Sequence, residues 1–122
     1  MSVFRSLSEL VEGGESIDYH LAAGFGGGLG RNGYVCGAVA AATMIISLEG
    51  RGKEKKEIYR DVDGFLNDFK SRFGEVNCRG LLGVDLKTKE GMAFLAAEGH
   101  KKCADYVRYA ADRVGDMISV RE

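Results

Sequence analysis

Residues 34–50 read YVCGAVAAATMIISLEG, and this segment decides the fold that the sequence predicts. It is apolar on nearly every side, which is typical of a helix buried in the middle of a bundle. A buried strand over ATMIIS is the alternative, but the length of the segment and its run of alanines favour a helix. We therefore expect a central buried helix whose alanines let neighbouring helices approach closely.

Helical periodicity continues on the C-terminal side of this segment. Apolar residues recur at steps of three and four in two further stretches, which is the spacing of amphipathic helices. The first stretch predicts a helix over residues 53–73 that ends at Gly74, because glycine readily adopts the left-handed conformation at a helix end. The second predicts a last helix over residues 100–118.

The remaining segments carry weaker signals. Glycines break up residues 78–99, where we expect two short helices, and residues 2–11 and 16–23 predict one or two more. No useful strand alternation appears. The sequence therefore predicts an all-α fold: a small single-domain helical bundle over residues 1–122, with a glycine-rich loop before the central buried helix. Residues 1–16 are expected to form a truncated or divergent first helix.

Composition narrows the function classes. The chain has 122 residues, 45% of them hydrophobic and 29% charged, and a net charge of −1, so nothing indicates nucleic acid binding. There is no apolar run of about 18 residues, so we expect no membrane span. The N-terminal residues include acids and spaced apolar side chains, unlike a signal peptide. These features predict a cytoplasmic protein.

The cysteines are Cys36, Cys78 and Cys103. An odd number without a Cys-x-x-Cys pair argues against a disulfide framework, a zinc knuckle or a thioredoxin-type motif. Each cysteine lies near an expected helix start. Asn32 or Gly33 can cap the helix that contains Cys36, and Asn77 can cap the turn that begins at Cys78. Helix N-termini stabilise thiolates and lower a cysteine pKa from about 8.5. The alternative is that each thiol packs inertly in the core.

Seven glycines lie between Gly24 and Gly37, and six of them precede the first cysteine. They include a G-x-G-x-x-G match over residues 28–33, but the strand that a dinucleotide fold requires before it is missing. We expect a tight loop with positive φ values whose N–H groups and arginine polarise a pocket beside the thiols. The predicted pocket residues are Gly26, Gly27, Gly28, Gly30 and Arg31. Anion or nucleotide binding at this loop is a further, weaker hypothesis.

The three cysteines lie together if residues 79–99 double back along the bundle. His100 lies three residues before Cys103, so both can share a helix face and complete a Cys3His set with Cys36 and Cys78. Such a set holds zinc or an iron–sulfur cluster. His20 is the other histidine candidate.

Three blocks of the chain resemble one known family. AAGFGGGLGRNGYVCGAVAAATMIISLEGRG, FKSRFGEVNCRGLLGVDL and KKCADYVRYAADRV, within residues 17–114, are similar to the C_GCAxxG_C_C family, to which a redox role is ascribed. The resemblance implies an all-helical domain, and related domains occur beside electron-transfer modules such as split-Soret cytochromes. It also implies that Cys36, Cys78 and Cys103 are the family cysteines, at which an iron–sulfur centre has been considered.

Two departures from the family bear on this interpretation. Ala41 stands where members tend to have glycine, which is a mild change. Members usually carry a further cysteine near the N-terminus, at a position that falls at or before Met1, so we expect that the start is truncated or the residue lost. The site would then be completed by a histidine, a water, an exogenous thiol or a second subunit. If a second subunit completes it, the protein is a homodimer.

Two function hypotheses follow. In the first, the protein is a small redox-active or metal-binding protein that works with a redox partner, and its three cysteines are the reactive groups or the ligands. In the second, it is a non-catalytic helical module that dimerises or binds a partner, with buried inert cysteines. Thiol reactivity separates them, because site thiols should be accessible with lowered pKa values. The sequence leaves open whether the protein is an enzyme.

Overall fold

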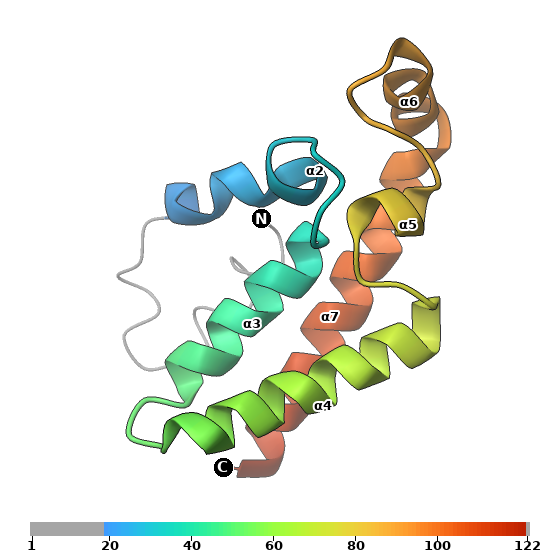
Figure 1. Ribbon diagram of the computed structural model, residues 1–122. Helices are drawn as coiled ribbons and strands as arrows, with labels where there is room; N and C mark the ends of the chain where they lie inside the picture. Colours follow the sequence, from blue (N-terminus) through green and yellow to red (C-terminus); the bar gives the residue numbers. More distant parts are fainter. Residues whose placement is uncertain (1–18, 122) are drawn as a thin grey trace.

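A computed structural model describes residues 19–121 and shows an all-α fold, as predicted (Figure 1). The predicted helix over residues 2–11 lies outside the described residues. A 3-10 helix and a π-helix, η2 and η3, accompany the α-helices. The elements in chain order are η2 Tyr19–Phe25, α2 Gly26–Leu29, α3 Gly37–Glu49, α4 Lys55–Phe73, α5 Cys78–Leu82, α6 Lys89–Phe94, η3 Leu95–Gly99 and α7 His100–Arg121.

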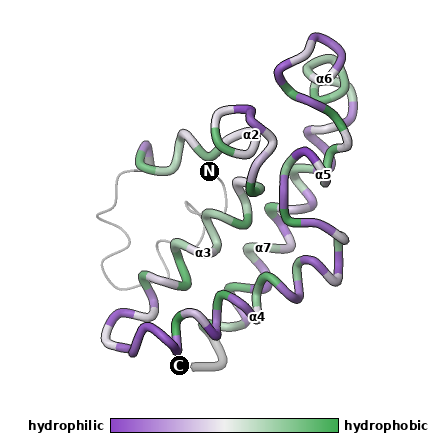
Figure 2. Tube along the Cα trace, viewed as in Figure 1, coloured by the Kyte–Doolittle hydropathy of each residue, from purple (hydrophilic) through white to green (hydrophobic). Residues whose placement is uncertain are grey.

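Helix α3 is the central buried helix, so the strand alternative for ATMIIS is wrong. It packs against both α4 and α7. Ala41, Ala42 and Ile45 are fully buried, and the hydropathy of α3 is apolar along much of its length (Figure 2). Small side chains let the neighbouring helices approach closely, and the larger Ile45 fills the space between them.

Helix α4 is amphipathic and ends where the sequence predicts. Phe65 and Phe69 are fully buried on its inner face. Gly74 follows with φ 83°, and its N–H donates to the carbonyl of Lys70 at 2.7 Å. Glycine ends a helix in this left-handed conformation without steric cost, because it has no Cβ.

The C-terminal third differs from the prediction in one respect. The two short helices exist as α5 and α6, but α6 runs through the π-helix η3 into α7 without a break, since Phe94, Leu95 and His100 all have right-handed helical backbone. Cys103 therefore does not lie beside free N–H groups at a helix start. The last helix also continues past residue 118 to Arg121.

Within residues 19–121, no helix is both long enough and apolar enough to span a membrane.

Candidate functional site

The glycine segment forms a short left-handed turn. Five consecutive residues, 27–31, have φ values of 64°, 68°, 65°, 62° and 71°. Two of them, Leu29 and Arg31, are not glycine, although L-residues rarely adopt this conformation. The predicted tight loop with positive φ is thus confirmed, and η2 rather than an α-helix precedes it.

Two glycines in this segment let the backbone come against helix α5. A Cβ on Gly28 would lie 2.6 Å from the backbone N of Tyr34 and 2.7 Å from the Cβ of Cys78. A Cβ on Gly33 would lie 2.8 Å from the Cβ of Arg79. All three distances are shorter than real Cβ contacts, so a larger residue at either position would push the glycine segment and its neighbours apart.

Backbone hydrogen bonds then join the glycine segment to the start of α5. The N–H of Cys36 donates to the carbonyl of Val76 at 2.8 Å, and the N–H of Cys78 donates to the carbonyl of Tyr34 at 2.7 Å. Between them, Val35 and Asn77 form an isolated antiparallel bridge. This short ladder holds the first two cysteines near each other, although they are far apart in sequence.

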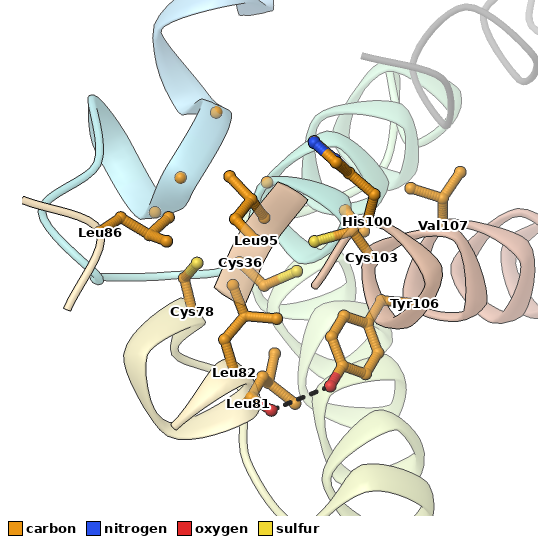
Figure 3. A pocket seen from close by; sticks show the side chains of 15 residues that line it. Cys36, Cys78, Leu81, Leu82, Leu86, Leu95, His100, Cys103, Tyr106 and Val107 are labelled. Atoms are coloured by element: carbon orange, nitrogen blue, oxygen red, sulfur yellow. Dashed lines mark hydrogen bonds between the residues drawn. The ribbon is translucent and has the colours of Figure 1, made fainter. Parts of the chain in front are cut away.

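All three cysteines line one cavity of about 250 Å³, which we call the thiol cavity (Figure 3). Cys36 precedes α3, Cys78 begins α5 and Cys103 lies on α7. Residues 79–99 therefore double back far enough to bring Cys103 to the same cavity as the other two cysteines. The remaining walls are largely apolar and include Leu81, Leu82, Leu86, Leu95 and Val107. No acidic residue lines this cavity among the described residues.

The other predicted site residues divide between two places. Gly26, Gly27, Gly28 and His100 line the thiol cavity, whereas Gly30 and Arg31 line a second cavity beside it. Arg31 therefore does not face the thiols as expected. His20 lies in η2 and lines neither cavity.

Burial raises the pKa of each of the three thiols, which is opposite to the sequence-based expectation. For Cys36 the backbone amides of Val39 and Ala38 lower the pKa, but less than burial raises it. The pKa of Cys78 rises to about 11, first through burial and then through the negative charge of the Cys36 and Cys103 thiolates. Burial also raises the pKa of Cys103, followed by the charge of Cys36. All three thiols are thus protonated near neutral pH.

The predicted helix caps also differ from the structure. Cys36 itself is the N-cap residue of α3, in place of Asn32 or Gly33. Asn77 occupies the N-cap position of α5 as predicted. Its side-chain amide, however, donates to Oε1 of Glu75 at 3.3 Å and does not cap the helix.

Sequence reasoning missed Tyr106, which also lines the thiol cavity. Its hydroxyl donates to the carbonyl of Leu81 at 3.1 Å, which ties α7 to α5 (Figure 3). Burial raises its pKa, and the negative charges of the three thiolates raise it further. Its position three residues after Cys103, on the same helix face, was the available signal.

The positions of the ligand atoms decide which metal group these residues fit. Across residues 19–121, no three Cys, His, Asp or Glu side chains converge to hold one metal ion. The side chains as placed do not form a site for a single zinc ion. An iron–sulfur cluster is wider than one ion and is bound by thiolates spaced around it, so three soft donors on an apolar cavity fit its chemistry.

The fold and the cavity define a small all-α protein with three thiols that line one largely apolar cavity. The chain belongs to the C_GCAxxG_C_C family, because the model of the family described as "Putative redox-active protein (C_GCAxxG_C_C)" matches residues 1–117. The resemblance seen in the sequence is thereby confirmed. No curated protein and no solved structure matches the chain.

Proposed function

We propose that this protein is a redox protein that binds an iron–sulfur cluster in the thiol cavity, with Cys36, Cys78 and Cys103 as ligands. The observation that carries the proposal is that three cysteines from three separate elements line one apolar cavity of about 250 Å³. Membership of a family described as redox-active agrees with it.

The electrostatics of the thiols support a cationic ligand. With a pKa of about 11, only about one Cys78 in ten thousand is a thiolate at pH 7, so the free thiol is a poor nucleophile. Each thiolate also raises the pKa of its neighbours. Iron cations would remove both penalties, because a coordinating thiol is deprotonated outright. The cluster, when bound, supplies one-electron transfer.

The other residues of the cavity have defined roles in this proposal. The leucine side chains place apolar surface around the thiols, so an unpaired thiolate is costly there. A bound cation would offset that cost by pairing with the thiolates. His100 lines the same cavity but is exposed, and its ring extends away from the three sulfur atoms in Figure 3, so it would have to turn inward to complete a Cys3His set. We propose that this protein is cytoplasmic and that electrons pass between it and a second redox protein.

A disulfide is the second candidate, and one observation favours it. The sulfur atoms of Cys36 and Cys103 point toward one another across the thiol cavity (Figure 3). Oxidation of this pair would form one S–S bond and release two protons and two electrons to the redox partner. Alkylation of the protein before and after oxidation distinguishes the candidates, since a disulfide would leave Cys78 as the one free thiol.

The test of the main proposal is an absorption spectrum with iron, zinc and acid-labile sulfide analysis on protein purified without oxygen. We expect iron and sulfide in similar amounts and visible charge-transfer bands. Cys36→Ser, Cys78→Ser and Cys103→Ser should each reduce the bands, whereas Ala104→Ser, on the exposed side of α7, should not. Protein without iron and sulfide after anaerobic reconstitution would contradict the proposal.

A further inference from the structure

A second cavity of about 540 Å³ lies beside the thiol cavity. The two share part of their walls, because Gly26, Gly27, Leu86 and Leu95 line both. Leu95 begins the π-helix η3, an irregular turn of a kind that occurs frequently at functional sites. A molecule in the second cavity would therefore be separated from the thiols by glycine backbone and two leucine side chains.

Arg31 is the one charged side chain among the described residues that line the second cavity. Within residues 19–121, no carboxylate forms an ion pair with its guanidinium. The residue has a φ of 71°, and its stem packs on Gly27, where an added Cβ would lie 3.0 Å from the Arg31 Cγ. A non-glycine residue in this conformation is strained, and such strain is concentrated at functional sites.

The walls of the second cavity and the charge of Arg31 indicate which kind of small molecule it would bind. An arginine forms two parallel hydrogen bonds with a carboxylate, and the exposed side chain of Arg31 is accessible to one. The walls that lead from Arg31 to the thiol cavity are glycine backbone and leucine side chains, which suit an uncharged apolar body. Both features together match a molecule with an anionic end and an apolar end.

We propose that the second cavity binds a small organic carboxylate, with the carboxylate on Arg31 and its apolar body against Leu86 and Leu95, which form part of the wall shared with the thiol cavity. The inference names the substrate class of the redox site and rests on the proposed function for the reaction that follows binding. Binding itself needs only Arg31 and the cavity walls, so it can be measured whether or not a cluster is present.

The test uses isothermal titration calorimetry on the full chain with hexanoate, 1-hexanol and inorganic phosphate as probes. We expect hexanoate to bind about two- to fivefold more tightly than 1-hexanol, the size of one ion pair with an exposed side chain. Arg31→Asn should remove that difference and leave 1-hexanol binding unchanged. Asparagine tolerates the left-handed backbone, so this variant should fold.

Arg60→Asn is the matched control, because Arg60 is an exposed arginine on α4, which lines neither cavity. It should bind all three probes like the wild type. Equal binding of hexanoate and 1-hexanol, or hexanoate binding that survives Arg31→Asn, would overturn the proposal. Phosphate that binds as tightly as hexanoate would overturn the assignment of a carboxylate with an apolar body. Failure to find iron would overturn the cluster while leaving these results unaffected.

Discussion

Gly28→Ala should destabilise this protein more than any other single alanine substitution in the glycine segment. The left-handed φ of 68° alone costs an alanine about 1–2 kcal/mol. The new Cβ would also lie 2.6 Å from backbone atoms of Tyr34 and 2.7 Å from the Cβ of Cys78, and overpacking of this kind costs about 1–3 kcal/mol. The free energy of unfolding should therefore fall by about 2–5 kcal/mol.

Gly30→Ala separates the two causes. Its φ is 62°, so the conformational cost is similar, but the nearest atom to an added Cβ is the Asn32 side-chain nitrogen at 3.9 Å. The expected loss is about 1–2 kcal/mol. Urea unfolding followed by circular dichroism gives both values. Equal losses for Gly28→Ala and Gly30→Ala would refute the argument that close packing of the turn on α5 determines the position of Cys78.

Three further predictions concern the core and the thiols. Phe69→Ala removes a fully buried ring that packs on Phe73, Tyr106 and Tyr109, and should lower the free energy of unfolding by about 3–5 kcal/mol in the same urea assay. Tyr106→Phe leaves the Leu81 carbonyl without its donor and should cost about 1 kcal/mol by thermal unfolding, with little change in secondary structure. Folding raises the pKa of Cys78 from 9.0 to about 11, so the stability from its protonated form is fully present below pH 9 and is lost as the pH rises through 11. Urea titrations of metal-free protein between pH 8 and about 11 should show this decline, and a Cys78→Ala variant with an unchanged pH dependence would contradict it.

The fold could be predicted because its main signals are local. The uniform apolarity of Gly37–Glu49 indicated a helix buried on all sides, and the step of three and four in Lys55–Phe73 indicated one buried face. Gly74 marked a helix end because its conformation is one that other residues avoid. The continuity of α6, η3 and α7 was not predictable from Gly99, since tertiary packing overrode the weak helix propensity of glycine.

The sequence indicated which residues could form the site, but not the direction in which the pKa values of its thiols shift. The expected helices place Cys36 and Cys78 at one end of the bundle, whereas the approach of Cys103 depends on the path of residues 79–99, which the sequence leaves open. The direction of their pKa shifts depends on how much apolar surface encloses them, which helix periodicity does not report. The placement of Arg31 in the neighbouring cavity follows from a run of left-handed residues that only the three-dimensional structure reveals.

The backbone ladder beside the thiol cavity has a consequence for the order in which a ribosome builds the site. Residues 33–79 contain both sides of this ladder and therefore two of the three cysteines, whereas Cys103 arrives with α7. During synthesis, two thiols are available to a metal or to an oxidant before the third has left the ribosome. The packing of α7 against α3 then adds one wall of the cavity, so this helix supplies both the third thiol and part of the apolar surface around the other two.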